Sequence, residues 1–429
     1  MTDGTPLTCD VCVIGSGLAG MAATVFAANR GLSVVQVGRT GEIMFASGLL
    51  DLLGVHPVSE RRSWSDPWAA LDALAKDIPG HPYARVEKED IKAAFDEILT
   101  FLEENGLRYH RRVDQNSEAL TSLGTLKTTY AVPHTMWKGV EALEEKPACL
   151  FIDIRGLKGF SARQVAASVQ KRWPDVRAAK ISFPYSDHLS ELYTEHMANA
   201  LLLPRNREKF AQTVAPHVKK SKLIGLPAIL GMYRTQEVIS HLEELIGVPL
   251  FEIPTIPPSV PGLRLKEAFE RGLQPKGVAY FSLQRVLEAR QPSGRQFETR
   301  IGRDEVEHII HSRGIILASG RFIGGGLHAD RKRIAETIFD LPVHQPNSRA
   351  EWHSRDFLDT RGHQINQAGL EIDDHFRPLD KSGKPVFETL FAAGSILAHN
   401  DWKRMKCGAG LAIASAFGAV RSFAGIGQQ

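Results

Sequence analysis

The sequence predicts an α/β protein with a Rossmann-like, doubly wound domain that is split along the chain by an inserted α/β domain. Residues 10–38 follow the order strand, glycine-rich turn, helix and second strand, which is typical of a nucleotide-binding βαβ unit. Two later apolar stretches, 314–320 and 390–395, also run into turns of small residues. Because the carboxyl ends of parallel strands share one edge of a sheet, we expect these turns to meet at a ligand site.

The first turn has the spacing G-x-G-x-x-G and consists of Gly15, Ser16, Gly17, Leu18, Ala19 and Gly20. In such turns the first glycine makes the tight turn, the second lets the backbone approach a phosphate, and the third lets the helix pack on the strand. The helix N-terminus adds free N–H groups and the positive end of a dipole. We therefore expect all six residues to contact a nucleotide cofactor.

The second strand of this unit lacks the acidic residue that usually binds the adenosine ribose. Its end is occupied by Gly38, followed by Arg39. Either the adenosine half is held in another way, or the cofactor has no adenosine half.

Composition excludes few classes of protein. The 429 residues suit two or three domains, and 43% hydrophobic and 24% charged residues are ordinary for a globular protein. The net charge of +3 is too small to indicate nucleic-acid binding, although it would tolerate anionic substrates or an anionic membrane surface. We identify no apolar run of about 18 residues and no signal-peptide pattern, and expect a cytoplasmic protein.

The cysteines do not predict a metal centre in this chain. They are Cys9, Cys12, Cys149 and Cys407, and the C-x-x-C pair straddles the start of the first strand, where small buried thiols are common. An iron–sulfur cluster needs about four suitably spaced thiolates. Any such cluster is therefore expected on a partner.

Three segments organise the chain. We expect a first nucleotide-binding segment at 1–69, an inserted α/β domain at 70–255, and a second cofactor-binding segment at 256–429. Evidence for the inserted domain comes from helical patterns at 90–105, 208–215 (ended by Pro216) and 235–246, and a βαβ pattern at 147–184. The proline-rich segment 254–264 is interpreted as a rigid joint that leads into a helix.

Further cofactor contacts are expected wherever small residues allow close backbone approach. The candidates are Ser47 and Gly48, Ser319 and Gly320, Gly394 and Ser395, and Gly408, Ala409 and Gly410. The last three begin an alanine-rich helix. The segment 40–54, which contains Ser47, is either a cofactor-contacting loop or a simple crossing loop.

These turns resemble the signatures of the flavoprotein superfamily that includes the fumarate reductase and succinate dehydrogenase flavoproteins, which have a split flavin domain and an inserted cap. Within it, the chain resembles the B subunits of anaerobic glycerol-3-phosphate dehydrogenases over nearly its whole length. The stretches that carry the resemblance include VIGSGLAG at 13–20, FASGLLDLLG at 45–54, PTIPPSVPGLRL at 254–265, ILASGRFIGGGL at 316–327 and FAAGSILAHNDW at 391–402.

The resemblance implies a flavin-dependent, quinone-linked dehydrogenase subunit with FMN rather than FAD. It also implies a catalytic A subunit, an iron–sulfur C subunit that docks the complex at the inner face of the cell membrane, and fumarate or nitrate as terminal acceptor. The reaction would oxidise sn-glycerol 3-phosphate to dihydroxyacetone phosphate. The helix start at Gly408–Gly410 would face the pyrimidine edge of the flavin. Gly38, and Ser395 where many FAD relatives have aspartate, leave FMN and FAD both open.

Substrate oxidation requires a base and a phosphate-binding cation. For the base we identify His399, between two glycine turns, and less strongly His134; a surface histidine is the simpler interpretation. For the anion we identify Lys403 and Arg404, just before the helix start at Gly408, although a solvated basic loop would look the same. Arg264 and Arg321 are further cations beside the motifs.

Three functions remain open at this point. The chain could oxidise the substrate itself, it could be an electron-relay or structural flavin-binding subunit whose partner does the chemistry, or it could be a stand-alone fumarate-reductase-like flavoprotein. The sequence shows no clear catalytic His–acid pair, which favours the second.

Overall fold

The computed structural model describes residues 6–39, 41–293 and 296–426. The chain divides into two compact units, which are described separately. Unit 1 comprises Met1–Glu42, Asp51–Phe101 and Phe269–Gln429, and unit 2 comprises Ile43–Leu50 and Leu102–Ala268. The inserted unit thus covers 102–268 with the short segment 43–50, whereas the sequence predicted 70–255. The bounds differ because helix α2 (Pro67–Asp77) and most of helix α3 (Lys88–Glu104) belong to unit 1, and because the divisions fall inside α3 and inside α9 (Val260–Leu273).

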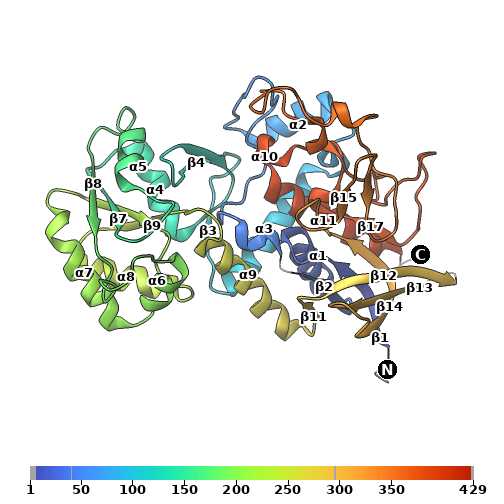
Figure 1. The fold of residues 1–429 in the computed structure, drawn as a ribbon, viewed down its shortest axis with the longest axis horizontal. Coiled ribbons are helices and arrows are strands. Elements are labelled where there is room, and N and C mark those ends of the chain that lie inside the picture. Colours follow the sequence, from blue (N-terminus) through green and yellow to red (C-terminus); the bar gives the residue numbers. More distant parts are fainter. Residues whose placement is uncertain (1–5, 40, 294–295, 427–429) are drawn as a thin grey trace. The chain divides into compact units, whose positions relative to one another are not determined.

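Unit 1 is built on a seven-stranded sheet with the order β11-β2-β1-β14-β13-β12, in which β17 also pairs with β14 (Figure 1). The pairs β11–β2, β2–β1, β1–β14 and β14–β17 are parallel, and β13 and β12 extend the sheet antiparallel. The strands are β1 (Leu7–Ile14), β2 (Val34–Gly38), β11 (Ala279–Ser282), β12 (Arg285–Ser293), β13 (Gln296–Gly302), β14 (His308–Leu317) and β17 (Leu390–Ala392).

Helices α1 and α11 pack against each other through Phe26 and Phe417, whose ring centroids are 5.2 Å apart. The other elements of unit 1 are α1 (Leu18–Asn29), α2 (Pro67–Asp77), α3 (Lys88–Glu104), α10 (Trp402–Met405), α11 (Gly408–Ile426), β15 (Leu327–Ala329) and β16 (Ile334–Glu336), with 3-10 turns at Pro82–Arg85, Gln274–Lys276, Arg349–Glu351, Gln364–Gln367 and Gly394–Ile396. Helix α9 (Val260–Leu273) and the 3-10 turn Glu42–Phe45 belong mostly to unit 2. Some of these elements straddle the division between the units.

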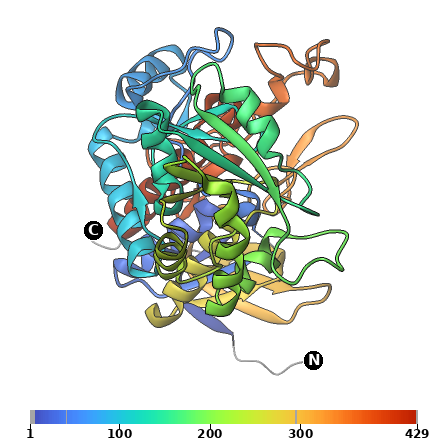
Figure 2. The ribbon, with the colours of Figure 1, turned by 90° about the vertical axis from the view of Figure 1, so that its left-hand side faces the viewer.

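Unit 2 contains a four-stranded parallel sheet with the order β10-β9-β7-β8 (Figures 1 and 2). Alternate residues of β7 enter different cores, because successive side chains of a strand point to opposite faces. Leu150 and Ile152 pack with α6, α7 and α8, whereas Phe151 packs with α4 and α5. The elements are β3 (Tyr109–His110), β4 (Ser117–Leu120), β5 (Leu126–Thr129), β6 (Val132–Pro133), α4 (His134–Glu145), β7 (Cys149–Ile154), α5 (Ala162–Val169), β8 (Val176–Ile181), α6 (Thr194–Ala200), α7 (Pro204–Val218), β9 (Leu223–Pro227), α8 (Thr235–Ile246) and β10 (Leu250–Ile253).

One predicted helix end is wrong. Pro216 does not end its helix but lies inside α7, which continues to Val218. A proline in the last turn removes only one backbone hydrogen bond there, so the helix continues for two residues.

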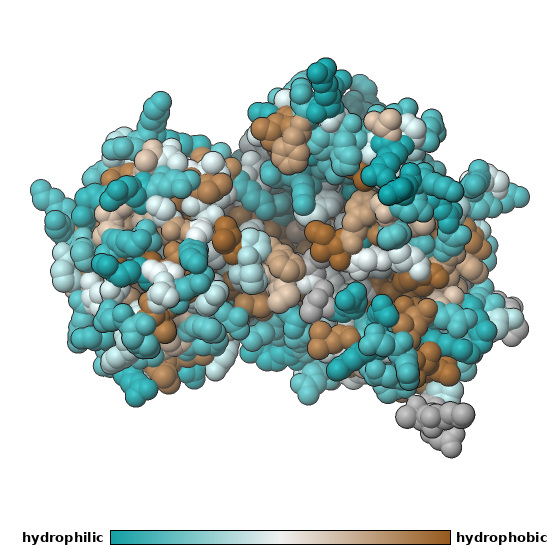
Figure 3. Space-filling view, in the orientation of Figure 1, coloured by the Kyte–Doolittle hydropathy of each residue, from teal (hydrophilic) through white to brown (hydrophobic). Residues whose placement is uncertain are grey.

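Helix α11 is the one described helix that is long and apolar enough to cross a membrane by length and composition, and 67% of its most apolar window is buried inside the structure. Figure 3 shows a mostly hydrophilic visible face on each unit, with apolar residues in small groups. The most exposed large apolar side chains of the described residues include Val113, Ile323, Phe357 and Leu358.

Candidate functional site

The first glycine turn of unit 1 has the geometry that its sequence predicts. Gly15 has a φ of +134°, and a Cβ there would lie 2.1 Å from the carbonyl oxygen of Ala318. A Cβ at Gly20 would lie 2.1 Å from the Gly15 oxygen, so the helix could not pack so close to the turn. A Cβ at Gly17, by contrast, would meet nothing within 4 Å. Two of the glycines are thus required by the fold, and the third borders open space.

The three glycine turns lie side by side at the carboxyl edge of the sheet. The Ala318 N–H donates to the Ile14 oxygen at 2.8 Å, and the Ala393 N–H donates to the Leu317 oxygen at 3.0 Å. Gly394, with a φ of +80°, approaches α1 so closely that a Cβ would lie 2.6 Å from the Cβ of Ala19. The turns after β1, β14 and β17 therefore form one continuous rim.

This rim presents groups of the kind that bind an anionic phosphate. The N-cap residue of α1 is Gly17, which offers no side-chain cap, and the first turn of α1 has no acidic residue. The amides at the start of α1 are therefore available to an anion. Ser319 adds a buried hydroxyl oxygen that has no hydrogen-bond partner among the described residues. Ser319 Oγ lies against Gly326, where a Cβ would be 2.5 Å from it. An unpartnered buried hydroxyl on this rim matches a polar ligand.

The end of β2 has no room for the missing acidic residue. A Cβ at Gly38 would lie 2.5 Å from Ser16 Oγ and 2.7 Å from the Ser16 amide nitrogen. Ser16 Oγ donates to the Arg39 carbonyl oxygen at 2.5 Å. The side chain of Tyr280 on β11 also hydrogen-bonds Ser16, and burial, then Glu270, raises the Tyr280 pKa to about 12. The usual ribose anchor is thus excluded by packing and not merely absent.

The N-terminus of α11 is partly covered. The Gly410 N–H donates to the Asp51 carbonyl oxygen at 2.6 Å, and a Cβ at Gly410 would lie 2.3 Å from Tyr83 Oη. The Gly410 amide is therefore engaged within unit 1. Gly408 and Ala409, expected with it at the flavin, are half-buried, and their role stays a prediction.

Ser47 and Gly48 lie on the short segment Ile43–Leu50, which belongs to unit 2. Gly48 has a φ of +80°, and a Cβ there would lie 2.6 Å from the Cβ of Pro261. Its carbonyl oxygen accepts a hydrogen bond from Tyr109 Oη at 2.8 Å. Gly48 is thus required by packing within unit 2. A cofactor contact of Ser47 or Gly48 stays a prediction.

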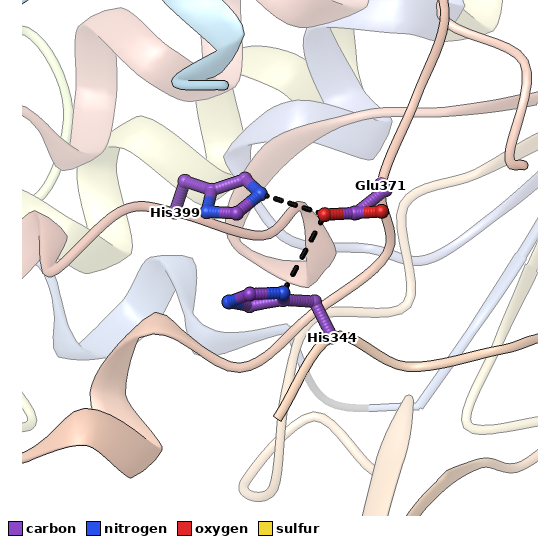
Figure 4. Close-up of side chains that lie close together, drawn as sticks. All are labelled: His344, Glu371 and His399. Atoms are coloured by element: carbon purple, nitrogen blue, oxygen red, sulfur yellow. Dashed lines mark hydrogen bonds and ion pairs between the residues drawn. The ribbon is translucent and has the colours of Figure 1, made fainter. Parts of the chain in front are cut away.

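His399 belongs to a cluster that the sequence analysis missed (Figure 4). Its Nε2 lies 3.0 Å from Glu371 Oε1, and His344 Nδ1 lies 3.4 Å from the same oxygen. Burial, and then the neighbouring His399, lower the pKa of His344. The structure therefore contains a His–acid pair, contrary to our expectation. His344 and Glu371 stand in irregular segments without a motif, so no sequence signal singled them out.

Of the basic residues near α11, Lys403 is the more available. Arg404 Nη1 pairs with Asp401 Oδ2 at 3.2 Å, whereas Lys403 is exposed and its Nζ lies 5.3 Å from the centroid of the Trp402 ring. His134, the weaker candidate base, lies in unit 2, where its Nδ1 is 2.7 Å from His110 Nε2.

Neither Arg264 nor Arg321 is free to bind a substrate phosphate. Arg264 is buried and donates to both carboxylate oxygens of Glu252 at 2.6 and 2.9 Å. Arg321 Nη2 donates to the carbonyl oxygens of Leu397 and Asn400, both at 3.0 Å, and burial lowers the Arg321 pKa to about 10. Both arginines stabilise the fold, which corrects their interpretation as anion-binding residues.

All four cysteines are buried and unpaired with one another. Burial raises the pKa of Cys9 to about 12 and raises the pKa of Cys12 as well. The C-x-x-C pair therefore stays in the thiol form, which is unreactive.

The sheet order and the rim of glycine turns are those of a nucleotide-binding α/β protein. A family model described as "FAD binding domain" matches residues 10–411, and the chain belongs to that family. Its α/β fold class and its flavin cofactor class were both predicted from the sequence, and both are confirmed.

The chain is similar to B subunits of anaerobic glycerol-3-phosphate dehydrogenase. It is 30% identical to the B subunit of Yersinia pseudotuberculosis over 95% of this chain and 96% of that protein. It is 29% identical to that of Pectobacterium carotovorum, with the same shares covered, and 27% identical to that of Vibrio vulnificus over 98% of both chains. A solved 3-ketosteroid Δ1-dehydrogenase from Sterolibacterium denitrificans aligns with a TM-score of 0.44 and 13% identity over 98% of this chain and 100% of that one. The resemblance to the B subunits is confirmed.

Proposed function

We propose that this chain is the flavin-binding subunit of a dehydrogenase that oxidises the secondary hydroxyl of sn-glycerol 3-phosphate to the ketone of dihydroxyacetone phosphate. The observation that carries the proposal is the full-length similarity to B subunits with this name, together with the rim of three glycine turns. Bound flavin supplies the hydride acceptor. This chain supplies the binding surface and the groups that move the hydroxyl proton.

The phosphate of the flavin would be held by the amides at the start of α1. Gly17 leaves the space for it, and Ser319 Oγ offers a further hydrogen bond. The packed junction of Gly38 with Ser16 supports FMN, because no ribose-binding acid fits there. The description of the family supports FAD, so the released chromophore is the deciding measurement.

His399 is proposed as the base. With Glu371 ionised, the ring nitrogen that faces it, Nε2, carries the proton, so Nδ1 is the nitrogen that can accept the proton of the substrate hydroxyl. Glu371 orients the ring and stabilises its positive charge after transfer. Lys403 and Arg404 are proposed to bind the substrate phosphate, with Arg404 weakened by its pair with Asp401.

The name of the relatives supports a complex of several subunits. We propose the partners that the resemblance implies: a catalytic A subunit, and an iron–sulfur C subunit that passes electrons to the quinone pool. The complex would then lie on the cytoplasmic face of the membrane, with membrane contact through a partner.

Two glycine variants test the flavin site. Gly17→Ala places a methyl group in open space and is expected to leave the fold intact while weakening flavin binding at least about tenfold. Gly20→Ala places it against the Gly15 oxygen and is expected to destabilise the fold itself. Flavin titration and thermal unfolding of both variants separate the two effects. Equal flavin affinity in Gly17→Ala and the parent would contradict the proposed site.

The chromophore and the substrate reaction are tested on the purified chain. The mass of the released chromophore distinguishes FMN from FAD, and anaerobic bleaching by glycerol 3-phosphate shows whether this chain oxidises substrate alone. We expect His399→Asn to slow the bleaching while the flavin content stays unchanged. Bleaching that needs the partner subunits would assign the substrate chemistry to them.

A further inference from the structure

In unit 1, one ring nitrogen of His399 and one of His344 face the same carboxylate oxygen of Glu371 (Figure 4). His399 Nε2 lies 3.0 Å and His344 Nδ1 lies 3.4 Å from the same oxygen of Glu371. The donor atoms of all three residues lie within 4.8 Å of one another. Two imidazoles and one carboxylate are thus gathered from three segments that are distant in sequence.

The backbone holds these three segments together. His344 and Gly369 exchange two hydrogen bonds, of 2.8 and 3.1 Å. The Leu370 N–H donates to the Ile396 oxygen at 2.8 Å, and the Ala398 N–H donates to the Leu370 oxygen at 2.9 Å. Gly369 permits this contact, because a Cβ there would lie 2.3 Å from the Ile396 oxygen. The cluster therefore rests on irregular segments that isolated β-bridges join to one another.

The ring of His399 is positioned by its own backbone and by a neighbour. His399 has a φ of +62°, a left-handed conformation that is uncommon for residues other than glycine. Its N–H donates to the Gln367 oxygen at 3.0 Å. Gly80 packs against the ring, since a Cβ there would lie 2.9 Å from His399 Cδ2. The fold thus maintains an unusual backbone that turns this imidazole toward Glu371.

We propose that His344, Glu371 and His399 bind one divalent transition-metal ion, with zinc as the first candidate. The ion takes the place of the proton between His399 Nε2 and Glu371, so the zinc-bound cluster and the metal-free base proposed above are alternative states of the same residues, and bound zinc would inhibit the base. Imidazole nitrogens and carboxylate oxygens bind zinc at about 2.0–2.2 Å, which separates neighbouring ligands by roughly 3–3.5 Å. The two separations from the Glu371 oxygen have these values. Because Glu371 and His344 are exposed, the ion can enter from water, and water can complete its coordination.

Calorimetric titration of the untagged, full-length chain with zinc tests the site. We expect one ion per chain with a Kd of about 1 μM or tighter. His344→Asn, Glu371→Gln and His399→Asn each remove one ligand and are expected to weaken binding by about 100-fold or more, beyond the effect of outer-shell changes. His375→Asn removes an exposed imidazole outside the cluster, four residues after Glu371 in the sequence, and is the matched control.

Two further measurements keep the test decisive if a variant folds poorly. Zinc is expected to raise the thermal midpoint of the parent and of His375→Asn equally, because the ion binds the folded state. X-ray absorption at the zinc edge is expected to show nitrogen and oxygen ligands without sulfur. The absence of saturable binding, binding unchanged in all three ligand variants, or sulfur ligands would overturn the proposal.

Discussion

His81 is expected to make the folded chain less stable as the pH falls. Its side chain is completely buried, and its Nδ1 accepts the Tyr83 N–H at 3.1 Å. The neutral ring therefore carries its proton on Nε2, which has no hydrogen-bond partner among the described residues. Burial, followed by the charges of His399 and His56, lowers the His81 pKa from 6.5 to about 3.

The sign of the effect follows from proton binding. Below about pH 6.5 the unfolded chain protonates this histidine, whereas the folded chain does not until the pH approaches 3. The unfolded state thus binds more protons in this window, and stability is lost as the pH falls through it. Going from pH 7 to pH 5 crosses about 1.5 units of the window, which corresponds to a loss of about 2 kcal/mol.

His81→Asn tests this reasoning, because the asparagine side-chain oxygen can still accept the Tyr83 N–H. Urea unfolding at pH 7 and pH 5 is expected to show that the parent loses about 2 kcal/mol more than the variant. His308→Asn, which removes an exposed imidazole, controls for the loss of a histidine as such. An equal loss in the parent and in His81→Asn would refute a buried, neutral His81.

Three substitutions test other parts of the fold by urea unfolding. Glu252→Gln breaks the buried pair with Arg264 and is expected to cost about 3–5 kcal/mol, whereas exposed Glu244→Gln should have little effect. Gly139→Ala places a Cβ 2.4 Å from Phe251 Cδ2 and should destabilise unit 2. The same substitution should cost less free energy of unfolding in a Phe251→Leu background, which removes the contacted ring. Equal costs of Gly139→Ala in the two backgrounds would contradict the contact. Arg321→Lys removes the donor to the buried Asn400 carbonyl and one of the two donors to the Leu397 carbonyl, and should cost about 3 kcal/mol. An unchanged stability would show that the guanidinium is dispensable.

Periodic elements and the glycine turn could be predicted from the sequence. The predicted helix at 235–246 is α8 (Thr235–Ile246), and the first βαβ unit has the predicted order of β1, α1 and β2. Local patterns suffice there, because helix and strand periodicity and turn glycines act over a few residues. The predicted division between the units agrees less well with the structure. It depends on which unit helices α2 and α3 pack against, and the local amino-acid sequence contains no pattern that indicates this.

The junction at the end of β2 shows why a missing residue could be noticed but not explained from the sequence. The pattern showed that Gly38 replaces the usual acid. Only the structure shows that Ser16, on the preceding turn, fills the space that a side chain would need. The two residues are 22 positions apart, and their approach is set by the pairing of β1 with β2. Cofactor choice at this point therefore depends on strand packing as much as on residue type.

Arg321 and Gly369 show how irregular segments can present donor atoms rigidly. Arg321 gathers the carbonyl oxygens of Leu397 and Asn400, the residues on either side of the turn that carries His399. Gly369 lets the segment with Glu371 lie directly against that turn. The segments are thus held in place by the hydrogen bonds of a buried guanidinium and by a close contact that only glycine permits, and not by a regular helix or strand. Because neither leaves a repeating pattern, sequence reasoning identified His399 alone and assigned Arg321 to a ligand instead of to the loop that it stabilises.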